Sequence, residues 1–230
     1  MVETFMTDPK DALLDAAMMH VPFDGCSETT LRAAARDADI PIEQARALFP
    51  RGPVDMALAF HTRGDERMLE RLKDEDLSAL KFRDRVARAV RLRIEVIDDK
   101  ETVRRGTTLF ALPQHSADGA KAIWGTADRI WTALGDTSED IDWYTKRATL
   151  SGVYASTVLF WLGDDSMDAQ DTWAFLDRRI EDVMSIEKAK AAVNNNPVLR
   201  ALMAGPNWAM SKVRKPSGVA RDDVPGRWGA

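Results

Sequence analysis

The stretch of residues 137–162, TSEDIDWYTKRATLSGVYASTVLFWL, constrains the fold of this chain more than any other. Thr137 followed by Asp140 is an acidic form of the capping box, so a helix is predicted to begin there. Further along, apolar side chains fall on every face of that helix, which places it at the centre of a helical bundle. Its first turn differs, because Trp143 and Tyr144 stand among charged residues near an end where burial is hard to complete.

The rest of the chain also predicts helices, so we expect an all-α protein. Pro9 suits a first helical position and Ser27 suits an N-cap, while Pro22 and Gly25 separate the two helices that these residues open. With 230 residues, the chain can form one large domain or two small ones. Further helices are predicted over residues 42–49, 53–60, 64–97 (with an acidic turn at 74–76), 102–112, 119–134 and 167–184.

Residues 27–60 have the pattern of a helix-turn-helix, with small alanines on one helix, a tight turn and then a short helix. The run LRAAARDADIPIEQARALFPRGPVDMAL resembles the N-terminal domain of TetR-type proteins, with Asp39 at the turn position where glycine is usual. DNA binding requires Lys and Arg on the docking face. The predicted recognition helix offers only Arg46, beside Glu43, and residues 1–60 carry a net charge of −5. We therefore interpret the motif as a structural remnant that does not read DNA.

No group of residues in the chain indicates catalysis, a metal or a cofactor. The three histidines, His20, His61 and His115, lie far apart, and none follows a Glu by three residues as a di-iron bundle would require. Each is interpreted as structural, and so is the single cysteine, Cys26, which fits a reducing cytoplasm. Five arginines surround the apolar stripe of residues 82–97 and are interpreted as a solvated face, or alternatively as a docking surface for an acidic partner: Arg83, Arg85, Arg88, Arg91 and Arg93.

The C-terminal segment differs in composition, since residues 187–230 carry a net charge of +5. Residues 197–215 are basic and amphipathic, which indicates a membrane-surface segment, although a helix packing on its own domain has the same pattern. Pro206 is predicted to divide this segment into two short helices. Its predicted membrane-contacting residues are Leu199, Leu202, Met203, Trp208, Met210 and Lys212.

Four runs together resemble the coenzyme Q biosynthesis accessory protein family conventionally numbered nine: LLDAAMMHVPFDG, ALFPRGPVDMALAFH, DTSEDIDWYTKRATLSGVY and DTWAFLDRRIEDVM. The resemblance covers residues 13–184 and is most specific in the DWYTKR segment. It implies a TetR-like all-helical fold without enzymatic activity, an isoprenoid lipid held in an apolar pocket, and a C-terminal amphipathic helix at the membrane. It also implies pairing with the di-iron demethoxyubiquinone hydroxylase. Trp143 and Tyr144 match the aromatic pair of the family's surface for that enzyme, and we assign Asp142 and Arg147 to the same surface.

The aromatic-rich body can be a packed core, or it can enclose the long apolar cavity that the resemblance implies. The residues assigned to such a cavity are Leu109, Phe110, Ile123, Trp124, Val153, Tyr154, Val158 and Phe175. The expected organisation is a helix-turn-helix-like domain at 8–60, a lipid-binding helical domain at 61–186, a linker at 187–196, the amphipathic segment at 197–215 and a disordered tail at 216–230.

The sequence thus predicts a non-catalytic lipid carrier at the cytoplasmic side of a bacterial inner membrane. It would bind a prenylated quinone intermediate or a phospholipid, present the quinone to the hydroxylase, form homodimers by analogy with TetR proteins, and use neither a cofactor nor nucleic acid. A ligand-responsive transcription regulator of the TetR type is the main alternative, and an uncharacterised lipid-converting enzyme is a third.

Overall fold

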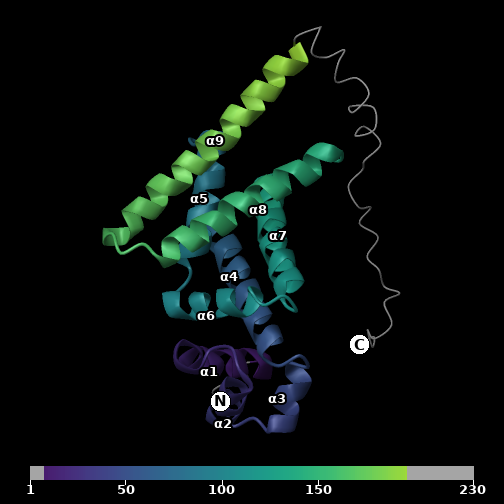
Figure 1. Ribbon diagram of the computed structural model, residues 1–230, viewed down its shortest axis with the longest axis vertical. Coiled ribbons are helices and arrows are strands. Elements are labelled where there is room, and N and C mark those ends of the chain that lie inside the picture. The colour runs from purple at the N-terminus through teal and green to yellow at the C-terminus, as the bar shows by residue number, and fades with distance from the viewer. Residues whose placement is uncertain (1–7, 196–230) are drawn as a thin grey trace, which may run out of the picture.

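The computed structural model describes residues 8–195, and their side chains as far as residue 185. This part of the chain is entirely helical and contains no strand, which confirms the predicted all-α class (Figure 1). The helices are α1 (Pro9–Asp24), α2 (Glu28–Asp37), α3 (Ile42–Leu48), α4 (Pro53–Asp74), α5 (Phe82–Glu95), α6 (Lys100–Phe110), α7 (Ser116–Ala133), α8 (Ile141–Leu162) and α9 (Gln170–Asn195), with a 3-10 turn at Met167–Ala169 before α9.

The first three helices form a small unit with a hydrophobic cluster of its own. Ser27 caps α2 as predicted, with its Oγ accepting the backbone N–H of Thr30 over 3.2 Å. Asp39 takes a left-handed backbone, φ 54°, in the turn between α2 and α3, which is the conformation that glycine usually supplies there. The cluster beneath these helices consists of Leu13, Leu14, Ala17, Leu31, Ala34, Ala35, Ala45, Phe49 and Met56.

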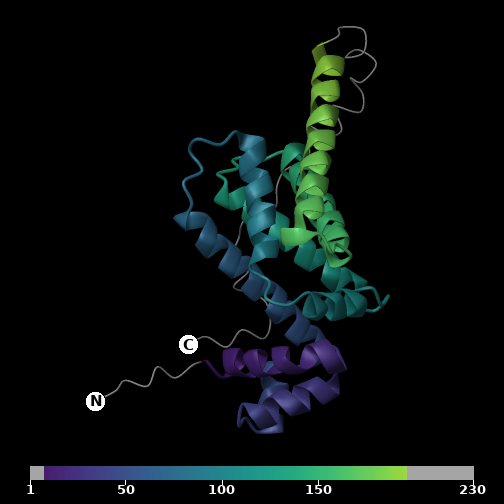
Figure 2. The same ribbon diagram turned by 90° about the vertical axis from the view of Figure 1, so that its left-hand side faces the viewer.

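Helix α4 connects this unit with the body of the molecule, as Figures 1 and 2 show. Met56, near its beginning, is buried in the N-terminal cluster, and Met68, three turns later, is buried in the cluster of the body. The expected domain boundary at residues 60 and 61 therefore falls inside a continuous helix. Any movement of the N-terminal unit that keeps α4 intact must also move the wall of the body that α4 forms.

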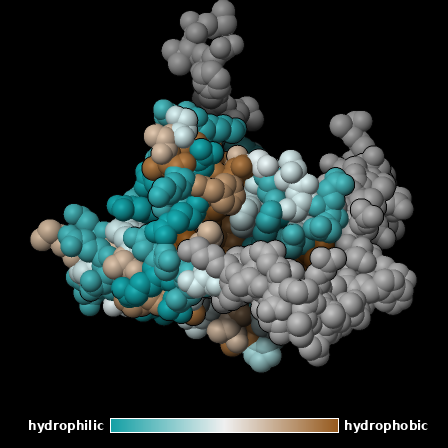
Figure 3. Space-filling view, turned by 90° about the horizontal axis from the view of Figure 1, so that it is seen from above, coloured by the Kyte–Doolittle hydropathy of each residue, from teal (hydrophilic) through white to brown (hydrophobic). Residues whose placement is uncertain are grey.

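The body is built around α8, which crosses its middle against α7 and α9 (Figure 1). Leu150 and Trp161 are buried in its core together with Ile94 of α5, Ile130 of α7 and Leu176 of α9. The end of α8 departs from the prediction of a helix buried all round, because Leu159 is 60% exposed and Phe160 is 36% exposed. Exposed apolar residues also gather between hydrophilic flanks on the face seen in Figure 3.

Several helix boundaries differ from those that the sequence predicts. Pro22 lies inside α1, which continues to Asp24 and ends only at Gly25. Helix α8 is capped by Asp140, whose Oδ1 accepts the N–H of Asp142 over 3.0 Å, so the predicted start at Thr137 was wrong. The structure needs the residues from 136 to 139 for the turn after α7, where Ser138 hydrogen-bonds to Asp136. Helix α9 continues to Asn195, so the predicted linker at 187–196 is helical at least that far. The predicted membrane segment at 197–215 and the predicted disordered tail at 216–230 lie outside the described residues.

Candidate functional site

A cavity of about 480 Å³ lies between the N-terminal unit and the body. Helices α1, α4, α5, α6, α7 and α8 all contribute to its wall, and its lining is mainly apolar. Four of the eight residues predicted to contact lipid line it, namely Phe110, Ile123, Tyr154 and Val158. This volume lies within the range of ~300–1,000 Å³ that is usual for small-molecule sites.

The other four predicted residues lie elsewhere. Val153 is 7% exposed and packs in the core of the body, because it faces away from the cavity on α8. Phe175 stacks on Phe160 with ring centroids 4.5 Å apart, and Trp124 contacts the aromatic pair of α8. Leu109 is half-buried but does not line the cavity. The structure does not bring these four residues to the cavity wall, since helical periodicity identifies apolar residues without saying which neighbour covers them.

Two glycines shape the wall that α6 and α7 form. A Cβ added at Gly119 would lie 2.8 Å from the Cβ of Phe110, so the close approach of α7 to α6 depends on this glycine. Gly106 also lines the cavity, but a Cβ added there meets no atom within 4 Å. Gly106 therefore borders empty space that a larger side chain could fill.

One end of the cavity is polar, and its groups come from three helices. His61 of α4, Arg93 of α5 and Tyr154 of α8 line it, and the last two are 2% and 4% exposed. Asp65, which is fully buried behind them, accepts hydrogen bonds from Arg93 Nε over 2.6 Å and Arg129 Nη1 over 2.9 Å. Thr126 of α7 completes the network, because its hydroxyl donates to Asp65 Oδ1 and is hydrogen-bonded to Nε2 of His61, both over 2.8 Å.

Burial sets the protonation of the groups in this region. It lowers the pKa of His61 to about 4, helped by the nearby charge of Arg93, so the imidazole is neutral at pH 7. Burial raises the pKa of Tyr154, whose hydroxyl therefore keeps its proton. Burial also raises the pKa of the Cys26 thiol to about 11, and Cys26 lines the same cavity. Neither the Cys26 thiol nor the Tyr154 hydroxyl is therefore ionised at neutral pH.

The sequence did not reveal this polar end. Arg93 was interpreted as part of a solvated arginine face, but it is buried, unlike Arg91 two residues earlier, which is 43% exposed in its side chain. His61 was interpreted as structural, and Asp65 was not singled out at all. His61 and Asp65 lie one helical turn apart, but this spacing alone does not indicate a polar site. The site is recognisable only once Arg93 of α5 is known to pair with Asp65.

A second surface surrounds the first turns of α8. Trp143 and Tyr144 lie edge-to-face with ring centroids 4.8 Å apart, and both contact Trp124 of α7. Both are half-buried, whereas Asp142 is exposed. The three aromatic residues thus form a partly exposed ridge along α7 and α8, which we call the aromatic ridge.

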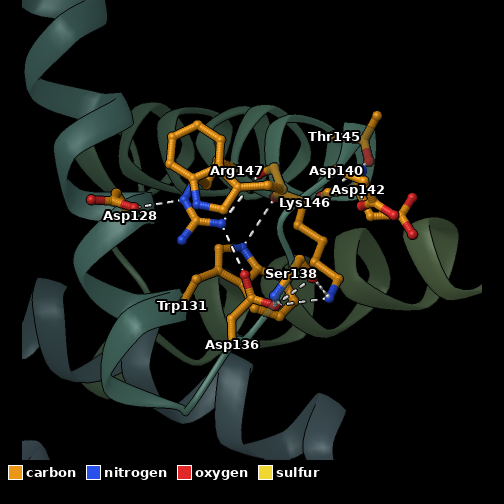
Figure 4. Close-up of polar contacts among 10 residues, drawn as sticks. Asp128, Trp131, Asp136, Ser138, Asp140, Asp142, Thr145, Lys146 and Arg147 are labelled. Carbon is orange, nitrogen blue, oxygen red and sulfur yellow. Dashed lines mark hydrogen bonds and ion pairs between the residues drawn. The ribbon is translucent and has the colours of Figure 1, made fainter. Parts of the chain in front are cut away.

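Arg147 packs against Trp143 of this ridge and makes the ion pairs drawn in Figure 4. Its guanidinium donates from Nε to Asp128 over 2.6 Å and from Nη1 to Asp136 over 2.9 Å, and it lies 4.1 Å from the ring centroid of Trp143. Arg147 is 2% exposed, so it cannot be the partner-contacting residue that the sequence suggested. Its role is to hold Trp143 and the turn before α8 in place.

Asp136 is the anchor of that turn. Burial alone would raise the pKa of Asp136, but hydrogen bonds from Lys146, Arg147 and Ser138 outweigh burial and hold the pKa well below its usual range. Lys146 Nζ lies 2.9 Å from Oδ1 of this carboxylate. The carboxylate is therefore ionised at all physiological pH values, and the turn is fixed by charge-assisted hydrogen bonds.

The arginines of the helix-turn-helix unit are engaged in ion pairs. Arg46 of α3 and Arg32 of α2 both pair with Glu28, with closest distances of 2.6 and 3.3 Å. Arg36 pairs with Asp37 over 3.1 Å. Two carboxylates, Glu28 and Asp37, thus offset part of the positive charge of these three arginines.

Comparison with known proteins first defines the class of the fold. The solved structure of a TetR transcriptional regulator from Nitrosomonas europaea matches with a TM-score of 0.63 at 19% identity, covering 76% of this chain and 97% of that chain. This likeness shows that the chain has a TetR-like helical fold, as predicted. Within residues 8–195, no helix is both long and apolar enough to cross a bilayer.

Sequence comparison then identifies the family. The COQ9 family model matches residues 116–187. The ubiquinone biosynthesis protein COQ9-B of Xenopus laevis is 30% identical, over 83% of this chain and 68% of that protein. The chain therefore belongs to the COQ9 family. The mitochondrial COQ9 proteins of Xenopus tropicalis and Homo sapiens are 31% and 29% identical, and this chain spans only 63% and 57% of their lengths.

Proposed function

We propose that this protein is a non-catalytic accessory protein of ubiquinone biosynthesis that binds a prenylated quinone intermediate and presents it to the demethoxyubiquinone hydroxylase. The relatives' names supply the pathway. The apolar cavity with one polar end is the observation that carries the proposal, because its form suits an amphiphile with a long tail.

The physical need for such a protein follows from the insolubility of prenyl tails. Each methylene removed from water contributes about 0.8 kcal/mol, so a free prenylated ring would not leave the bilayer unaided. An apolar cavity replaces the bilayer as the surroundings of the tail and brings the ring to a protein surface. In this function the cavity binds and transfers the ligand, and the chemistry takes place on the partner enzyme.

A cavity-filling substitution tests the lipid-binding step. Gly106 lines the cavity and has open space around its missing Cβ, so we expect Gly106→Leu to reduce lipid binding without loss of folding. Gly152→Leu is the matched control, because Gly152 is also a helical glycine with open space around its missing Cβ but lies outside the cavity wall. Native mass spectrometry and extraction of the purified proteins would identify the lipid. A wild-type protein that carries no lipid and binds no added prenyl quinone would contradict the proposal.

The aromatic ridge is the surface that we propose for the hydroxylase. Large aromatic side chains at the centre of an interface contribute much of the binding energy, and Trp124, Trp143 and Tyr144 offer such a group. We expect Trp143→Ala to abolish capture of the hydroxylase in a pull-down while Phe23→Ala, an 81% exposed aromatic on α1, leaves it unchanged. Thermal unfolding of both variants would separate lost contact from lost structure. Unchanged capture by a folded Trp143→Ala protein would remove the ridge from the proposal.

Membrane association is proposed for residues 197–215. A chain ending at Asn195 should keep the fold and the cavity but lose binding to anionic vesicles, which sedimentation would measure. Equal vesicle binding by the shortened and full-length chains would assign the membrane contact to another part of the molecule.

A DNA-binding regulator is the alternative that the fold likeness favours. It would require a basic docking face, yet Arg32, Arg36 and Arg46 are all paired with carboxylates. A gel shift showing salt-dependent DNA binding at micromolar protein would support the regulator over the carrier.

A further inference from the structure

The polar end of the cavity is built from buried side chains in a region whose other walls are apolar. Arg93 and Tyr154 are more than nine-tenths buried, and both line the cavity together with His61. The side chain of Tyr154 contacts both of the others. The rings of His61 and Tyr154 lie edge-to-face with centroids 6.4 Å apart, and the Arg93 guanidinium lies 5.8 Å from the Tyr154 ring centroid. Because a few placed polar groups in an otherwise apolar cavity can fix the orientation of a ligand, this end has the form of a recognition site.

The hydrogen bonds of His61 decide which of its nitrogens carries the proton. Nε2 lies 3.2 Å from the carbonyl oxygen of Ala122, which can only accept, and 2.8 Å from Thr126 Oγ1. The Thr126 hydroxyl is itself a donor to Asp65 Oδ1 over 2.8 Å. Nε2 is therefore the protonated nitrogen, and Nδ1 holds a lone pair.

That lone pair is available at neutral pH. Burial keeps the pKa of His61 at about 4, so Nδ1 is not protonated. Within the part of the chain that the structure describes, only Nε2 of this ring is engaged in hydrogen bonds. His61 thus brings an unused acceptor to the wall of the cavity.

Two of the three guanidinium nitrogens of Arg93 are already engaged by protein groups. Arg93 donates from Nε to Asp65 and from Nη2 to the carbonyl oxygen of His61, over 2.6 and 2.9 Å. Asp65 compensates its charge from a fully buried position, and Arg129 shares the same carboxylate. An anionic headgroup would have to compete with Asp65, whereas a neutral head needs only the acceptor on His61. The free acceptor on His61 therefore suits a neutral head that can donate a hydrogen bond.

We propose that this end of the cavity receives a neutral, hydroxyl-bearing aromatic head, of the phenol or hydroquinone class, whose O–H donates to Nδ1 of His61. This inference rests on the lipid-binding function proposed above and adds the orientation and chemistry of the ligand. The ring lies against Tyr154, and the tail extends toward the side of the cavity where Leu159 is 60% exposed. His61 becomes a residue that determines ligand specificity.

A pair of ligands that differ only at the hydroxyl tests this assignment. A farnesyl-substituted phenol and its methyl ether have the same ring and tail, but the ether cannot donate a hydrogen bond. One neutral hydrogen bond corresponds to a preference of about twofold to twelvefold for the phenol, measured as the ratio of dissociation constants by isothermal titration calorimetry. His61→Leu should bring that ratio to about one while both ligands still bind, and His61→Gln, whose amide oxygen can accept, should restore part of it.

The outcomes separate this inference from the lipid-binding proposal. If the wild-type protein binds neither ligand, the lipid-binding proposal itself fails. If it binds both equally, or if His61→Leu keeps the preference for the phenol, lipid binding stands and the role of His61 is overturned. Should His61→Leu not fold, His61→Phe replaces the imidazole by an apolar ring and gives the same test.

Discussion

Arg147 and Asp136 form an ion pair in which each side chain is only 3% exposed, with Nη1 of the arginine 2.9 Å from Oδ2 of the aspartate. The same guanidinium lies under the ring of Trp143. This relationship couples the stability of the turn between α7 and α8 to the shape of the aromatic ridge. A change at either residue should therefore affect both the folding and the surface of the protein.

Replacing Arg147 by Met should destabilise the fold strongly. The substitution leaves Asp136 buried without this partner, and breaking such a pair typically costs about 3–5 kcal/mol of unfolding free energy. Arg32→Met is the control, because Arg32 is 65% exposed in its ion pair with Glu28 and should lose no more than about 1 kcal/mol. Urea unfolding monitored by circular dichroism measures both, and equal losses would contradict this account of the buried pair.

The contribution of Asp136 should depend on pH with a defined sign. The pKa of Asp136 is depressed in the folded protein, so its stabilising effect is fully present above the unfolded pKa of about 3.9 and is lost as the pH falls further. Asp136→Asn should therefore be much less stable than the wild type at pH 7, and the difference should narrow below about pH 4. Urea unfolding at a series of pH values tests this, and a constant difference down to pH 3 would assign the cost of the substitution to something other than charge.

Two glycine-to-alanine substitutions should change stability in opposite directions. A Cβ at Gly64 would lie 2.6 Å from Nη1 of Arg93, whose side chain is held by Asp65 and His61. We expect Gly64→Ala to lose about 1–3 kcal/mol. Gly152 on α8 has open space instead, so Gly152→Ala should gain about 0.5–1 kcal/mol from helix propensity. Thermal unfolding compares the two, and a stabilised Gly64→Ala protein would show that Arg93 can move freely.

Cys26 should report the state of the cavity. Because burial raises the pKa of its thiol from 9.0 to about 11, the thiolate fraction at pH 8 is about a hundredfold lower than in the unfolded chain. Reaction with a disulfide reagent should be slower in the folded protein than in the unfolded chain, and slower again when a lipid fills the cavity that Cys26 lines. Reaction at the same rate with and without bound lipid would place the lipid away from Cys26.

Much of the local structure was determined by the sequence alone. Pro9 and Ser27 mark the starts of α1 and α2. The first backbone N–H groups of a helix have no partner within the helix, so Pro9, which lacks an N–H, fits there, and the Ser27 side chain accepts one of these N–H groups. The turn at Asp39 and the central position of α8 follow from equally local rules of backbone conformation and hydrophobic pattern. The family was also identifiable, since the motif runs that carry the resemblance are contiguous in the chain.

The sequence indicated part of the cavity lining, but only the tertiary structure decided which side chains meet at its polar end. Asp65, Arg93 and Tyr154 come from three helices, and their proximity depends on how α4, α5 and α8 pack. Arg93 and Arg91 belong to the same amphipathic helix, yet one is buried against Asp65 while the other is half-exposed. Helical periodicity fixes the direction of each side chain around its own axis, but it does not specify the neighbouring helix. Whether a group is solvated, paired or part of a cavity wall was therefore settled by packing between helices.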